Sequence, residues 1–141
     1  MPSAIEPPEE DAIHVWRVEL GAAGRAAARA ALGHVLGDYL GGEEAPGLTV
    51  APGGKSRLAD DPGRLSFNLA HSGALALVAI APGGVEVGVD LERLRARRDL
   101  VRLAARWLPA AEAAAVAAAD PGERERVFYA AWTAHEARVK C

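Results

Sequence analysis

The run from residue 66 to residue 92 constrains the fold most, because it holds three apolar stretches separated by turns. These stretches read SFNLAHSG, LALVAIA and VEVGVDLE, and a PGG turn connects the last two. Short apolar runs bounded by Gly and Pro are typical of β-strands. The PGG connection leaves two alternatives open, a hairpin between LALVAIA and VEVGVDL or a break between two halves of a fold. The run therefore predicts successive strands.

Helical periodicity lies on both sides of this run. The alternating stretch HVWRVEL, starting at His14, predicts a first strand, and the large apolar residues of 22–40 recur at helix spacing. After Arg93 the pattern is helical again, with Pro109 separating the first apolar stripe from an Ala-rich segment and DPGE starting a third helix. Residues 1–13 are acidic and rich in Pro, which predicts a disordered tail. The pattern predicts an α+β fold.

Composition excludes several classes of protein. The chain has 141 residues, half of them hydrophobic, which is enough to bury one core. A net charge of −3 provides no basic field for nucleic acid, and no run approaches the roughly 18 apolar residues of a membrane span. The single cysteine, Cys141, excludes an internal disulfide framework, and the N-terminus does not resemble a signal peptide. We therefore expect a cytoplasmic location and no nucleic-acid or membrane partner.

Two carboxylates in VGVDLE are the first candidates for chemistry. In a strand, Asp90 and Glu92 project from the same face, where they repel each other unless a cation lies between them. Mg²⁺ is commonly held by one or two carboxylates together with water and substrate phosphate. The alternative is a solvated strand end beside the RLRARR stretch. The spacing alone leaves both interpretations open.

The last predicted helix adds a third carboxylate. Glu136 and Lys140 are spaced i, i+4, so they share a helix face, with Trp132 one turn earlier. The plain alternative is an exposed ion pair that contributes a few tenths of a kcal/mol. The neighbouring His135 borders the apolar face, where a packed histidine is the more common role.

The remaining candidates are His71 and Lys55. His71 follows the stretch FNLA and precedes Ser72 and Gly73, so it could present its imidazole and nearby N–H groups to an anion, or cap a turn. Lys55 lies in a Gly-bearing loop. Arg supplies almost all of the 16 basic residues, and the two lysines, Lys55 and Lys140, carry the compact ammonium that suits phosphate.

Four motifs occur together in a recognisable order. They are GK at 54–55, FNLAHS at 67–72, GVDLE at 88–92 and FYAAWTAHEARVK at 128–140. In this order the chain resembles the surfactin-type 4′-phosphopantetheinyl transferases from about His14 to its last residue. The resemblance implies transfer of phosphopantetheine from coenzyme A to a serine of an acyl or peptidyl carrier protein. It also implies a fold of two pseudo-repeated halves, here 14–84 and a partial second half, 85–141.

The resemblance also implies a role for each candidate residue. Asp90, Glu92 and Glu136 match the acids that hold Mg²⁺, and Glu136 also matches a base for the incoming serine. Lys140 and His71 match phosphate contacts of coenzyme A, and Lys55 matches the lysine near the nucleotide. The chain departs from the family pattern at three positions, which hold Ser56 after the lysine, Ala70 before the histidine and His135 before the motif glutamate.

The resemblance further implies that two strands expected after the last helix are absent, so that the second half is incomplete. Three functions follow from these observations. They are an active transferase, a relative that binds coenzyme A or carrier protein without catalysis, and a small interaction module.

An incomplete second half leaves strand edges and an apolar face uncovered, so we predict self-association of the isolated chain. Sedimentation or size-exclusion measurements would detect it. A monodisperse monomer that melts cooperatively would contradict this prediction.

Overall fold

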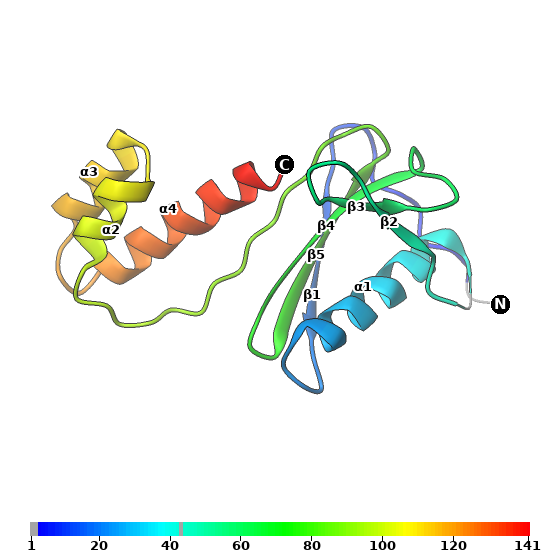
Figure 1. Cartoon of the computed structure of the whole chain (residues 1–141), viewed down its shortest axis with the longest axis horizontal. Coiled ribbons are helices and arrows are strands. Elements are labelled where there is room, and N and C mark those ends of the chain that lie inside the picture. Colours follow the sequence, from blue (N-terminus) through cyan, green and yellow to red (C-terminus); the bar gives the residue numbers. More distant parts are fainter. Residues whose placement is uncertain (1–2, 43) are drawn as a thin grey trace.

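The computed structural model describes residues 3–42 and 44–141 and contains both helices and sheets, which confirms the predicted α+β class (Figure 1). The elements run in chain order as β1 (His14–Glu19), α1 (Arg25–Leu40), β2 (Leu48–Val50), β3 (Ser56–Leu58), β4 (Leu65–Ser72), β5 (Leu75–Pro82), α2 (Leu100–Trp107), α3 (Ala110–Ala118) and α4 (Arg124–Val139). The pseudo-repeat and the domain boundaries stay predictions.

Three strands form an antiparallel sheet in the order β1-β5-β4. Strands β4 and β5 form a hairpin in which Ser72 pairs with Leu75. Strand β1 pairs with the other edge of β5, where His14 lies opposite Ile80. The short strands β2 and β3 form a separate antiparallel pair. The central strand of the main sheet is therefore β5.

Helix α1 covers one face of this sheet (Figure 1). Its apolar residues recur at helix periodicity and pack on the sheet. Leu36 of α1 is completely buried, and so are Val78 and Ile80 of β5 in the same cluster. Gly41 ends the helix in a left-handed conformation at φ 67°, which glycine adopts without the steric cost of a Cβ. This cluster is the main hydrophobic core.

The predicted strand VEVGVDLE is wrong. After Gly83 and Gly84 the chain leaves the ladder and runs without strand pairing towards α2 (Figure 1). A hairpin with β5 is impossible because β1 and β4 already occupy both of its edges. The apolar alternation serves packing instead, since Val87 is 3% exposed and packs with Ala79 and Ala81 on the sheet face opposite α1. We call residues 85–92 the linking segment.

Helices α2, α3 and α4 form a second core beyond the linking segment (Figure 1). Its buried residues are Leu100, Ala104, Leu108, Val116, Phe128 and Tyr129. All three helices predicted after Arg93 are thus confirmed. None of the helices within the described ranges has both the length and the apolar character needed to cross a membrane.

The N-terminal segment partly packs on the protein. Within the described part of residues 1–13, the backbone N–H of Ile5 donates to the carbonyl oxygen of Asp38 at 2.8 Å, and the Ile5 side chain packs against the main core. Residues 1–2 lie outside the described ranges.

Tyr39 places a hydrogen-bonded hydroxyl in the main core. Its side chain is 1% exposed, and its hydroxyl lies 2.8 Å from Nε1 of Trp16, which donates to it, and 2.8 Å from Nδ1 of His14. Tyr39→Phe removes the hydroxyl that these two groups share, so we expect the free energy of unfolding in urea to fall by about 1–2 kcal/mol.

The matched control is Tyr129→Phe, because the Tyr129 hydroxyl makes one long bond of 3.4 Å to the carbonyl oxygen of Arg95. We expect a clearly smaller loss there. Equal effects of the two substitutions would contradict the role assigned to the Tyr39 hydroxyl.

Candidate functional site

The end of α4 meets the linking segment through Lys140. Its ammonium donates to the carboxylate oxygen Oδ1 of Asp90 at 2.8 Å and to the carbonyl oxygen of Val89 at 3.1 Å. The Asp90 side chain is 7% exposed and that of Lys140 is 34% exposed. Two motifs separated by 50 residues in the chain are therefore in direct contact.

Negative charge gathers around this contact. The second carboxylate oxygen of Asp90, Oδ2, is buried without a hydrogen-bond partner among the described residues. Burial raises the pKa of Glu92 above its ordinary value, and the neighbouring charge of Asp90 raises it further. Glu136 also raises the Glu92 pKa, whereas the indole of Trp132 and the ammonium of Lys140 lower it. Asp90 and Glu136 are thus both close enough to Glu92 to raise its pKa.

The buried, unpartnered oxygen of Asp90 suits a cation, although the three carboxylates do not surround a common position. Within 3–42 and 44–141, no group of three His, Cys, Asp or Glu side chains has the arrangement of a metal site. The Lys140 ammonium already neutralises one oxygen of Asp90, while Oδ2 has no partner within these ranges. An unpartnered buried carboxylate oxygen is costly, and a divalent cation is one group that would satisfy it.

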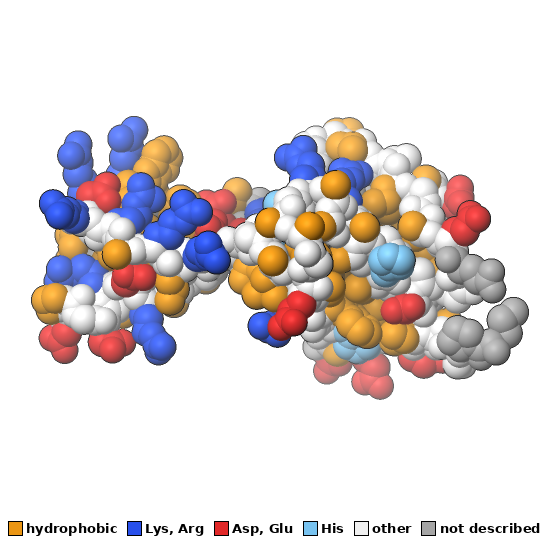
Figure 2. Space-filling view, turned by 90° about the horizontal axis from the view of Figure 1, so that it is seen from below, with side chains coloured by type: hydrophobic (Ala, Val, Ile, Leu, Met, Phe, Trp, Pro, Cys, Tyr) orange, Lys and Arg blue, Asp and Glu red, His pale blue; other side chains and the backbone are white. Residues whose placement is uncertain are grey.

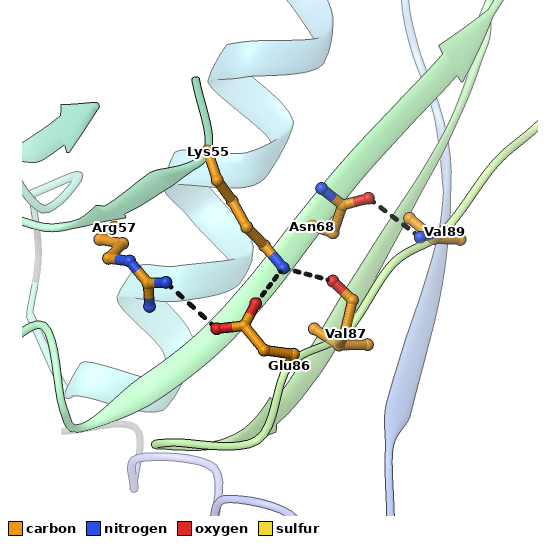
Figure 3. Close-up of polar contacts among 6 residues, drawn as sticks. All are labelled: Lys55, Arg57, Asn68, Glu86, Val87 and Val89. Atoms are coloured by element: carbon orange, nitrogen blue, oxygen red, sulfur yellow. Dashed lines mark hydrogen bonds and ion pairs between the residues drawn. The ribbon is translucent and has the colours of Figure 1, made fainter. Parts of the chain in front are cut away.

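Lys55 makes a second contact with the linking segment (Figure 3). Its ammonium donates to Oε2 of Glu86 at 2.8 Å and to the carbonyl oxygen of Val87 at 2.8 Å. Arg57 donates to the other carboxylate oxygen of Glu86 at 3.1 Å. Hydrogen bonds from Lys55 and then Arg57 lower the pKa of Glu86. The loop before β3 is therefore tied to residues 86 and 87.

Sequence reasoning missed Glu86 and the role of Asn68. The side-chain oxygen of Asn68 accepts a hydrogen bond from the backbone N–H of Val89 at 2.9 Å (Figure 3). The signal for Glu86 was its spacing, because in an extended chain it has the same parity as Asp90 and Glu92. The signal for Asn68 was its rarity, as the chain contains no other asparagine.

His71 lies apart from these contacts. It is exposed near the end of β4 and pairs in register with Ala76 of β5. Its ring makes no hydrogen bond with any described residue, so it is not joined to the contact between Asp90 and Lys140. His135 is half-buried, and its ring centroid lies 6.3 Å from that of Trp132.

Among the cavities that open beside these residues, two have more basic than acidic side chains in their lining. One, of about 390 Å³, lies between the chain around Glu92 and the helices, and its other lining includes Arg93, Arg95, Trp107, Tyr129 and Trp132. Figure 2 shows Lys and Arg side chains concentrated over this helical part of the molecule. The other, of about 370 Å³, contains Lys55, Arg25 and Arg29 beside apolar residues. Guanidinium, ammonium and apolar groups together suit an anionic ligand with apolar parts.

Gly88 allows the close approach of α4 to the linking segment. A Cβ at this position would overlap the carbonyl oxygen of Ala137 and lie 3.0 Å from the backbone nitrogen of Cys141. We expect Gly88→Ala to lower the free energy of unfolding by about 1–3 kcal/mol, because backbone atoms must move apart. Hydrogen exchange of the Lys140 amide should also become faster as the last turn of α4 separates.

Gly122→Ala is the matched control, since a Cβ there would meet nothing within 4 Å. It should leave both measurements nearly unchanged. If Gly88→Ala behaved like Gly122→Ala, the close contact between the linking segment and α4 would be refuted.

Comparison with known proteins gives a consistent result. Residues 86–141 match the model of the 4′-phosphopantetheinyl transferase superfamily. The chain is 36% identical over 119 residues to the 4′-phosphopantetheinyl transferase HetI of Nostoc sp., an alignment covering 81% of this chain and 49% of the relative. It is also 36% identical over 94 residues to a Synechocystis sp. protein provisionally named as such a transferase, covering 66% of this chain and 38% of that protein. The chain thus spans half or less of the length of these relatives.

Proposed function

Because the chain belongs to the 4′-phosphopantetheinyl transferase superfamily, we propose that it takes part in transferring phosphopantetheine from coenzyme A to a serine of an acyl or peptidyl carrier protein. The observation that supports this most directly is the contact of Lys140 with Asp90 and Val89. It joins the two motifs that carry the proposed acids and the proposed phosphate ligand.

We assign Asp90, Glu92 and Glu136 to binding Mg²⁺. The unpartnered Oδ2 of Asp90 and the raised pKa of Glu92 support this assignment, because a buried carboxylate oxygen lacks a donor and because burial and the charge of Asp90 disfavour the ionised form of Glu92. When bound, the ion would neutralise the pyrophosphate of coenzyme A, which three carboxylates would otherwise repel. This proposal rests on the chemical identity of the three residues, because the described side chains do not form a metal-binding arrangement.

The remaining residues position the substrates and move one proton. Glu136 accepts the proton of the acceptor serine hydroxyl, whose oxygen then bonds to the phosphorus of the phosphopantetheine phosphate. The bond from that phosphorus to the adenosine bisphosphate breaks, and 3′,5′-adenosine bisphosphate leaves. Lys140 and His71 stabilise the charge that develops on the phosphates, and Lys55 contacts the nucleotide end.

Mass spectrometry of an apo carrier protein incubated with the chain, coenzyme A and Mg²⁺ tests the function. We expect the carrier to gain one phosphopantetheine group, and Asp90→Asn to slow this gain by roughly 100-fold or more, as loss of an electrostatic group in an active site does. The matched control is Asp38→Asn on the exposed side of α1, which should leave the rate unchanged.

The other outcomes are equally informative. Binding of coenzyme A without transfer would replace this proposal with a binding protein that lacks catalysis. A folded chain that binds neither coenzyme A nor a carrier would favour an interaction module. Equal rates for Asp90→Asn and the parent chain would remove Asp90 from the site. Self-association and a cytoplasmic location stay predictions.

A further inference from the structure

The cavity next to Lys55 concentrates positive charge. Arg25 and Arg29 are spaced i, i+4 on α1, so two guanidinium groups share one helix face, an arrangement that destabilises a helix in the absence of an anion. Both line the cavity of about 370 Å³ together with Lys55, and none of its described lining residues is acidic. Neither arginine has an ion-pair partner within 3–42 and 44–141.

Lys55 lies between this cavity and Glu86. Its side chain is 17% exposed, and two of its three N–H donors are used by Glu86 and by the carbonyl oxygen of Val87. Glu86 is not part of the cavity wall and is 51% exposed. The Lys55 ammonium therefore lies between the cavity and the carboxylate of Glu86.

Glu86 has a partner that can retain it when Lys55 turns away. Arg57 donates to its Oε1 at 3.1 Å, and the Glu86 side chain is 51% exposed, so water can replace the ammonium at Oε2 (Figure 3). The energetic cost of exchanging the contact is small, because partly exposed ion pairs contribute little net free energy. A phosphate in the cavity would give Lys55 a more highly charged partner, flanked by two arginines.

We propose that Glu86 is an internal competitor for Lys55, which a phosphate group bound among Arg25, Arg29 and Lys55 displaces. Lys55 also donates to the carbonyl oxygen of Val87, so occupancy of the cavity is coupled to the contact between Lys55 and the linking segment. That the natural phosphate belongs to coenzyme A rests on the proposed function. The exchange of partners at Lys55 rests only on the cavity and the ion pair.

Equilibrium binding of two probes, 3′,5′-adenosine bisphosphate and inorganic pyrophosphate, at low ionic strength tests the proposal. Glu86→Gln should tighten binding about two- to fivefold, the range expected on releasing a partly exposed ion pair. The control is Glu112→Gln, which removes the same charge from a carboxylate that pairs with Arg138 at 3.5 Å in the helical part. It should change affinity much less.

A second background separates competition from a general charge effect. In Lys55→Met, which weakens binding, the additional change Glu86→Gln should improve affinity no more than Glu112→Gln does. Weaker or unchanged binding by Glu86→Gln in the parent chain would overturn the proposal, as would an equal improvement in the Lys55→Met background. Circular dichroism melting of each variant verifies that the fold is intact.

The two probes also distinguish this inference from the proposed function. If pyrophosphate responds to Glu86→Gln as expected while the bisphosphate does not bind, the competition stands and a coenzyme A site is refuted. If both probes respond but no carrier protein is modified, the competition again stands and the transfer activity is refuted. Failure of both probes to bind would overturn the inference.

Discussion

The ammonium of Lys140 supplies the contact on which the candidate site depends. It lies between the carboxylate of Asp90 and the carbonyl oxygen of Val89, so one charge connects the last turn of α4 to the linking segment. Without this contact Asp90 would be a largely buried carboxylate with no positive partner, and burial of an unpaired charge is strongly unfavourable. Gly88 makes the approach possible, because any side chain at that position would overlap the backbone of α4.

The linking segment has a different partner on each side. Val87 packs on the alanines of β5, which anchors the segment to the sheet without strand pairing. Its polar groups point elsewhere: Glu86 meets Lys55, and the backbone N–H of Val89 meets Asn68. These contacts place the proposed phosphate-binding loop, the sheet and the acidic residues within one connected structure. A segment without regular secondary structure is thus held by packing and by four polar side chains.

Charge is distributed in a way that suits a phosphate-rich substrate and a metal. Burial and the neighbouring carboxylates raise the pKa of Glu92, whereas arginines and a lysine line a cavity on the sheet side. Acidic groups for a divalent cation and basic groups for phosphate are the complementary parts of such a site. Glu86, an acid next to the basic cavity, pairs with Lys55 of the cavity lining and also with Arg57, which lies outside that lining.

The sequence by itself determined the helices and the first strands, because the spacing of apolar residues within each segment fits either a helix or a strand and depends only on neighbouring residues. It also identified Asp90, Glu92, Glu136 and Lys140 as candidates, since their residue types limit their chemistry. It could not determine that VEVGVDLE stays outside the sheet, because alternation is the same whether a segment pairs with a strand or packs on a sheet face. Only the tertiary structure decided this, by giving both edges of β5 to other strands, and only it joined Lys140 to Asp90 and Lys55 to Glu86. Contacts between residues far apart in the chain depend on how the elements pack, which local sequence patterns do not record.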